Sequence, residues 1–219
     1  MQNNIKDIEN ESDSVGSNSV YNEMVLNFIS NLGYKDISSL FSEENQIKNE
    51  SSPMLERRFK IREIIEKGDI NNVITELNDI NVELIDENYY LYYLLIQHKA
   101  YEKANKLHSI KNLDDKSKSK MILKVIDYLK EEVNMIIEKY DELHGLLEDF
   151  LEYLIFNSSN IKIENKRKEL GDIINKMILE KYSLGESELE RVVKGIVSEE
   201  STLSKTNKFI EFKKWIKRE

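Results

Sequence analysis

Apolar side chains recur three or four residues apart along most of the chain, which is the spacing of helices that each bury one face. The pattern is most regular between Arg58 and Glu102, where it predicts three short helices in tandem. Gly68 can take the left-handed conformation that ends a helix, and Asp69 can cap the helix that follows. Asp86 and Asn88 suit the start of the third helix. We expect this stretch to be the centre of the fold.

A shorter helical pattern precedes this stretch, between Val20 and Asn45. It predicts a first helix that ends at Gly33, then a turn, and then a second helix whose Ile37, Leu40 and Phe41 face inward. A helix pair of this length buries too little apolar area to be stable alone, so we expect it to contact a partner. The residues expected to form this partner interface are Met24, Val25, Phe28, Ile29, Tyr34 and Phe41.

Helical spacing continues to the end of the chain. Ser52 as a cap with Pro53 in the first turn is expected to open the helix that leads into the central stretch. Further helices are predicted over Met121–Val133, Ile136–Leu154, Leu170–Ile178, Leu189–Ile196 and Phe209–Ile216. With one proline and seven glycines in 219 residues, the chain is poor in turn formers, and the predicted fold class is all-α.

The central stretch resembles a CTLH domain, and the match runs without a gap from Glu56 to Glu102. It is carried by the run Ile61–Ile70, by Ile74, Leu77 and Asn78, and by the segment Leu84–Gln97.

The shorter pattern before it resembles a LisH motif. A pair of small residues in the second helix of that motif is replaced here by Ile37 and Ser38, which argues against a close crossing of the two helices. The residues that carry the resemblance are Met24, Val25, Phe28, Ile29, Gly33, Tyr34 and Phe41.

Val125–Leu129 and Phe150–Asn157 resemble the CRA region that follows CTLH in the same family. The resemblance implies that the end of this region returns to the first helix pair, with Trp215 beside it. The implied organisation is a disordered tail at 1–19, a LisH motif at 20–46, a CTLH domain at 54–110 and a CRA-like helical region at 115–219.

The LisH-CTLH-CRA resemblance implies a non-catalytic scaffold in a GID/CTLH-type E3 ubiquitin ligase that directs proteins to proteasomal degradation. The implied partners are other LisH-CTLH-CRA subunits, including RING-bearing ones, and a substrate receptor, with homo- or heterodimers formed through LisH. The alternative is a LisH dimerisation adaptor for cytoskeletal or signalling partners, without a ubiquitin role.

Composition narrows the function classes. The formal net charge of −9 disfavours nucleic acid as the main partner, because the chain repels phosphates at long range. No apolar run approaches the roughly 20 residues of a membrane span, and the polar N-terminus is unlike a secretory signal, so a soluble protein of cytoplasm and nucleus is expected. The absence of cysteine excludes disulfides, thiolate zinc sites and thiol chemistry.

No arrangement of residues predicts catalysis, a metal site or a cofactor. His98, His108 and His144 lack metal-ligand spacing, and neighbouring carboxylates on a helix point about 100° apart. Arg62 is expected to pair with Glu66 or with a carboxylate of another helix.

Four tyrosines around Leu91 cannot all enter one core. We expect Tyr90 and Tyr93 to pack inside and Tyr89 and Tyr92 to belong to the partner interface. Leu91 itself is expected to be a core residue. The basic, aromatic stretch Lys205–Arg218, which contains Trp215, is interpreted as a closing helix whose aromatic face packs on the core. The alternative is a helix that binds a membrane surface or a calmodulin-type partner.

Overall fold

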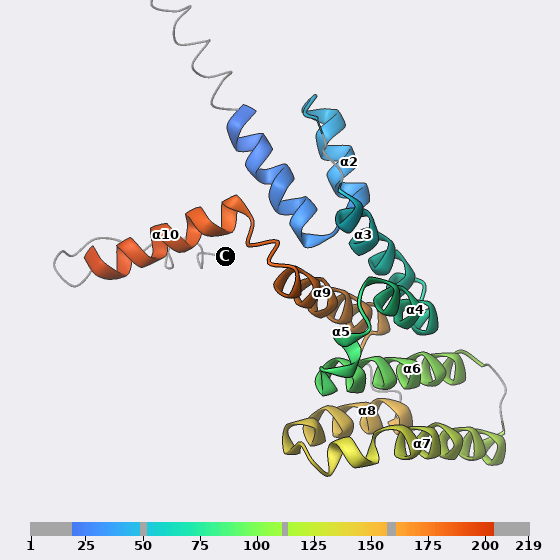
Figure 1. The fold of residues 1–219 in the computed structure, drawn as a ribbon. Helices are drawn as coiled ribbons and strands as arrows, with labels where there is room; N and C mark the ends of the chain where they lie inside the picture. Colours follow the sequence, from blue (N-terminus) through green and yellow to red (C-terminus); the bar gives the residue numbers. More distant parts are fainter. Residues whose placement is uncertain (1–18, 49–51, 111–113, 157–160, 204–219) are drawn as a thin grey trace, which may run out of the picture. The chain divides into compact units, whose positions relative to one another are not determined.

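The computed structural model describes residues 19–48, 52–110, 114–156 and 161–203, and every element in these ranges is helical. The expectation for the N-terminal tail before Ser19 and that for the helix with Trp215 therefore lie outside the described residues. The chain divides into two compact units (Figure 1). The first combines parts of Met1–Leu55 and Leu184–Glu219, and the second is Glu56–Ser183.

The first unit contains a helix over residues 19–32, helix α2 (Lys35–Glu44) and helix α10 (Glu188–Leu203). The first two form a hairpin, which we call the N-terminal helix pair. Gly33 ends the first helix with φ +79°, as the sequence predicts, because a residue with a side chain is strained in this left-handed conformation.

The crossing of the N-terminal helix pair is close, contrary to the expectation drawn from Ile37. Ser38 is fully buried, and its Oγ lies 2.9 Å from Oγ of Ser30 on the facing helix. Two side chains this short can meet only where the helices approach closely. Ile37 and Leu40, which were expected to face inward, are 53% and 58% exposed, because the small serine face of α2 takes the inner position.

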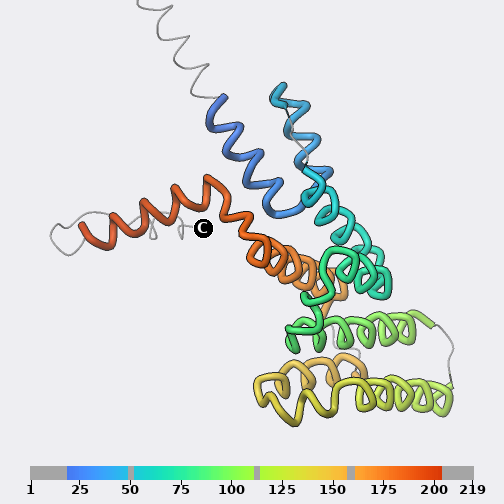
Figure 2. Tube along the Cα trace, in the orientation of Figure 1, coloured from blue at the N-terminus to red at the C-terminus, as the bar shows by residue number. Residues whose placement is uncertain are grey.

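The second unit is organised around helix α6. In Figures 1 and 2 this helix lies between α7 and α8 on one side and α4, α5 and α9 on the other, and it packs against all five. The helices of this unit are α3 (Pro53–Glu66, which begins in the first unit), α4 (Ile70–Ile80), α5 (Glu83–Asp86), α6 (Tyr89–Ser109), α7 (Asp115–Ile137), the 3-10 turn η1 (Asp141–Leu143), α8 (His144–Phe156) and α9 (Ile163–Lys181).

Helix starts follow local side-chain chemistry. Ser52 accepts a hydrogen bond from the amide of Leu55, Asp69 one from Asn72, and Asn88 one from Leu91, so the three predicted caps are confirmed. Asp86 does not cap the third helix, because it is the last residue of the additional short helix α5. The third helix is also longer than predicted, with 21 residues.

The prediction of one helix through Ile136–Leu154 is wrong. Helix α7 ends at Ile137, Tyr140 is extended with φ −131° and ψ 95°, and α8 starts at His144. No proline marks the break, and apolar residues keep helical spacing across it. The turn lets α8 run back beside α6, and the ring of Tyr140 stacks on Tyr89 of α6 at a centroid distance of 3.5 Å.

The core of the second unit is aromatic where α6 meets α8. Tyr101 of α6 packs edge-on against Phe150 of α8, with ring centroids 4.9 Å apart, and both side chains are buried. Leu91 and Tyr93 are buried, as expected, whereas Tyr90 is only half-buried. Burial raises the pKa of Tyr93, the largest effect on that group.

A largely buried ion pair joins α9 to α6. Arg167 of α9 makes two hydrogen bonds of 2.7 Å to the carboxylate of Glu102 on α6 and a third, of 3.0 Å, to the carbonyl of Glu66. Gly68 has φ +74°, and a Cβ placed there would lie 2.6 Å from both the Arg167 guanidinium and the Glu102 carboxylate. Gly68 therefore allows the left-handed backbone at the end of α3 and leaves room for this ion pair.

Arg62 pairs with a carboxylate of another helix, one of the two expected alternatives. Its Nη2 lies 2.8 Å from Oδ1 of Asp172 on α9, and the adjacent Gly171 leaves room for the guanidinium. One turn earlier on α3, Arg58 donates to Asn175 at 2.7 Å. Burial, and then the charge of Arg62, lowers the pKa of Arg58 to about 10. The polar contacts hold α3 against α9.

Candidate functional site

Two of the three histidines contact backbone carbonyls, and the third is exposed. His98 is buried, with its ring nitrogens 3.0 Å and 2.8 Å from the carbonyls of Leu94 and Lys166. His108 contacts the carbonyl of Tyr153 at 3.1 Å, and His144 is exposed. Among the residues that the structure describes, no group of three or more potential ligands could hold a metal ion. None of the helices described is long and apolar enough to cross a membrane.

We expect His98 to make stability depend on pH. Burial lowers the pKa of His98, the largest effect, although hydrogen bonds to two carbonyls oppose it. The unfolded chain therefore binds a proton below about pH 6.5 more readily than the folded chain does. The stability that depends on neutral His98 should be fully present above that pH. As the pH drops below it, the free energy of unfolding should fall by at most about 1.4 kcal/mol per pH unit for one proton.

Urea unfolding from pH 7.5 to 5.0 would measure this dependence for the native chain and for His98→Gln. The variant removes the titrating group, so its stability should fall less over the same range. Equal slopes for the two proteins would show that His98 does not contribute.

The surface of the N-terminal helix pair is unusually apolar. Val20 and Tyr21 are 56% and 64% exposed and lie on the same unit as the exposed Ile37 and Leu40 of α2. Among the described residues of the first unit, only Leu26 and Leu55 are buried hydrophobic side chains. Several large apolar side chains exposed on one small helical unit are typical of a protein interface.

Polar contacts occupy the inside of the N-terminal helix pair. Besides the Ser30–Ser38 contact, Asn22 donates to Asn45 at 3.0 Å, which joins the far ends of the two helices. Neither Ser30 nor Asn22 was predicted to matter, although their spacing of eight residues along the helix could have suggested a polar face. The predicted interface residues of the pair are all half-buried, neither core nor fully exposed: Met24, Val25, Phe28, Ile29, Tyr34 and Phe41.

Helix α10 is tied to this pair at its first turn. Ser187 and Glu190 form reciprocal hydrogen bonds, Ser187 Oγ accepting from the Glu190 amide at 3.2 Å and Glu190 accepting from the Ser187 amide at 3.0 Å. Asn27 of the first helix also accepts from the Glu188 amide at 3.2 Å. No residue of α10 is buried, and Val192 and Ile196 lie exposed on its apolar side.

Tyr89 and Tyr92, the other predicted interface residues, have partners within the second unit. The Tyr89 hydroxyl donates to Glu142 at 2.7 Å, and the Tyr92 hydroxyl donates to Glu132 at 3.2 Å. The hydrogen bond to Glu142 raises the pKa of Tyr89. The two tyrosines lie on α6 in the second unit, whereas the other predicted interface residues belong to the first unit.

Comparison with known proteins gives the apolar surface of the N-terminal helix pair a context. The chain is 23% identical to GID complex subunit 8 of Schizosaccharomyces pombe over 175 residues, which cover 76% of this chain and 71% of that protein. The chain is similar to GID complex subunit 8. Two proteins named glucose-induced degradation protein 8 homolog also match: that of Nematostella vectensis, 30% identical over 83 residues, and that of Dictyostelium discoideum, 33% identical over 91 residues.

The similarity to the GID8 proteins is uneven in extent. The matched segments cover 37% of this chain and 36% of the Nematostella protein, and 41% of this chain and 40% of the Dictyostelium protein. The chain thus spans well under half of these two relatives and about seven tenths of the fission yeast subunit. No protein-family model matches the chain.

Proposed function

We propose that this protein is a non-catalytic scaffold subunit of a GID-type E3 ubiquitin ligase. One observation carries the proposal: the N-terminal helix pair closes on itself through serine and asparagine side chains and leaves its large apolar side chains, except Leu26, half-covered or exposed. A pair built in this way is stabilised by covering its apolar surface with another subunit. The similarity to a protein named as a GID complex subunit supports the same assignment.

The scaffold function consists of positioning. The N-terminal helix pair acts as the LisH motif and joins a second LisH-CTLH-CRA subunit, while the CTLH and CRA-like helices hold RING-bearing subunits and a substrate receptor. Catalysis belongs to those partners, and the assembly directs substrates to proteasomal degradation in cytoplasm and nucleus.

Replacing Phe28 and Ile29 with glutamate tests the proposal. Both side chains are half-buried in the free chain, so a subunit that covers them would have to bury two carboxylates. We expect self-association of the full chain to weaken at least tenfold. Light scattering at about 0.3 M salt should then show a mass closer to that of the 25.9 kDa monomer. Ile155→Glu with Phe156→Glu is the matched control, because it changes two exposed apolar residues of the second unit by the same charge.

Circular dichroism must show that the variant keeps its helices. A Phe28→Glu, Ile29→Glu variant that associates as the native chain does would contradict the proposed contact. Affinity purification from cells then separates the functions: RING-bearing relatives recovered with the native chain and lost with the variant support the ligase scaffold. Recovery of cytoskeletal or signalling proteins without them would favour the adaptor.

A further inference from the structure

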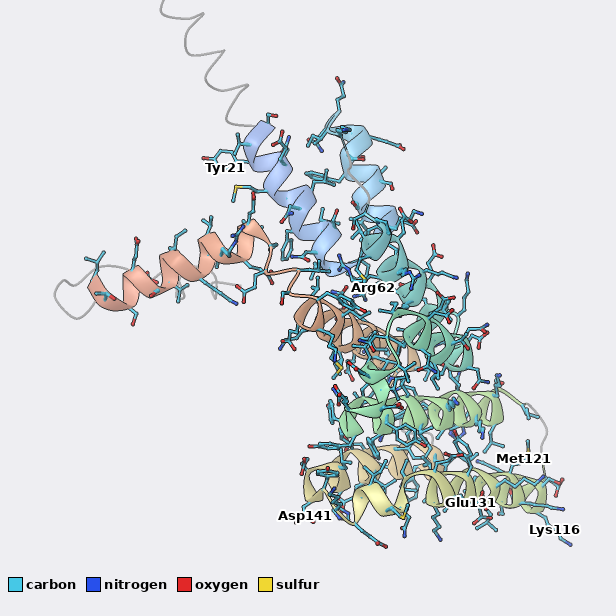
Figure 3. All side chains as sticks on the ribbon, in the orientation of Figure 1. Tyr21, Arg62, Lys116, Met121, Glu131 and Asp141 are labelled. Atoms are coloured by element: carbon cyan, nitrogen blue, oxygen red, sulfur yellow. The ribbon has the colours of Figure 1, made fainter. Side chains whose placement is uncertain are left out.

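The outward side of helix α7 carries opposite charges on its two halves. Lysines occupy the first half and carboxylates dominate the second, where Lys130 is the exception. Figure 3 labels Lys116 and Met121 near the start of this helix, Glu131 in its second half and Asp141 just beyond its end. We define the α7 outer face as the exposed residues Lys116, Lys120, Leu123, Lys124, Asp127, Lys130, Glu131, Asn134 and Glu138.

These residues share one side of the helix. At about 100° per residue they fall within roughly 60° of the direction of Asp127. The buried residues Val125, Leu129, Val133 and Ile137 lie outside this sector and pack into the unit. The whole outer face is therefore available to another molecule at once.

The charged groups of this face have few partners of their own. Within the described part of the chain, Lys120, Lys124 and Glu131 take part in no ion pair, and Glu138 accepts one hydrogen bond, of 2.8 Å, from Asn134. The α7 outer face therefore has one basic half and one acidic half, and its charges are complementary to those of the same face in the opposite direction. A copy turned end to end presents acid where the first copy presents base.

We propose that the α7 outer face pairs antiparallel with the same face of a second copy of this chain, about a two-fold axis near residue 128. Lys120 then faces Glu138 of the second copy, and Lys124 faces Glu131, each pair occurring twice by symmetry. The midpoints of the two pairs, at residues 129 and 127.5, agree within the reach of a lysine side chain. Leu123 adds apolar contact beside Asn134.

This contact between copies is separate from the one proposed for the N-terminal helix pair, because it uses another unit of the chain. A helix of 23 residues is roughly 34 Å long, and pairing along one face places the interface at the small end of specific protein contacts. The ion pairs of this interface are exposed, so added salt weakens them; the screening length is about 10 Å at 0.1 M salt. We expect association that grows at low salt and is lost at high salt.

Two charge reversals in the full chain test the pairing. Variant one is Lys120→Glu with Lys124→Glu, and variant two is Glu131→Lys with Glu138→Lys. Each variant replaces four attractive contacts by four repulsive ones. Sedimentation velocity at low salt should therefore show that association is weaker by about tenfold or more. An equimolar mixture should recover it, because each half of one variant then opposes the opposite charge on the other.

The matched control is Lys168→Glu with Lys176→Glu on α9, two exposed lysines whose reversal changes the net charge as variant one does. It should associate as the native chain does. Since all these proteins keep the N-terminal helix pair, only the α7 pairing predicts recovery on mixing. Variants that associate normally, or a mixture no stronger than its components, would overturn the proposal without touching the proposed scaffold function.

A covalent readout is possible because the chain contains no cysteine. Lys130 lies within two residues of the proposed axis, so Lys130→Cys should form a disulfide-linked dimer under mild oxidation at low salt. Lys168→Cys on α9 is the control and should remain uncoupled. Equal dimer yields for the two variants would contradict the antiparallel pairing.

Discussion

Replacing Glu102 with alanine is expected to destabilise the second unit by about 2 to 4 kcal/mol. Glu102 accepts two of the three hydrogen bonds that the Arg167 guanidinium donates, and the side chains of Glu102 and Arg167 are only 10% and 19% exposed. Without the carboxylate, the arginine would keep its charge in a largely desolvated position, which costs more than the pair contributes when intact. The contact lies under Gly68, so the turn between α3 and α4 should loosen as well.

Urea unfolding of Glu102→Ala, Arg167→Ala and the double variant would measure this effect. The double variant should lose less stability than the sum of the two single ones, because it leaves no unpaired charge. Additive losses would mean that the two side chains do not depend on each other and would contradict this interpretation.

Replacing Phe150 with alanine should cost about 3 to 5 kcal/mol. Its ring is fully buried and packs edge-on against Tyr101 where α8 meets α6, so alanine leaves a cavity that rigid neighbours cannot fill. Thermal unfolding would show a lowered midpoint, with Phe150→Leu between the two. Ile155→Ala on the same helix is the control, because Ile155 is exposed and its loss should change stability by less than about 0.5 kcal/mol. Equal effects at Phe150 and Ile155 would contradict the assigned core.

Sequence predicted this fold wherever a local interaction determines the structure. Ser52, Asp69 and Asn88 act on amides three residues away, and Gly33 and Gly68 act through their own backbone angles, so the pattern around each residue was sufficient. The turn between α7 and α8 was missed because it depends on packing. Tyr140 leaves the helix to stack on Tyr89, about fifty residues earlier in the chain, and nothing beside it signals a break.

The candidate interface was predicted only in part, for the same reason. Apolar spacing identified the residues of the N-terminal helix pair, but it could not show that Ser38 occupies the crossing and that Ile37 and Leu40 point outward. The α7 outer face was also missed. Its lysines and carboxylates are ordinary surface residues until the packing of Leu129 and Val133 shows which side of the helix is left for solvent.

The position of α6 has a consequence for local opening. Helices α4, α5, α7, α8 and α9 all pack against it, so we expect the amides on its buried sides to exchange only when much of the second unit unfolds. Hydrogen–deuterium exchange in α6 should then report the global free energy of unfolding, whereas α10, which buries no residue, should exchange through fraying of its own turns.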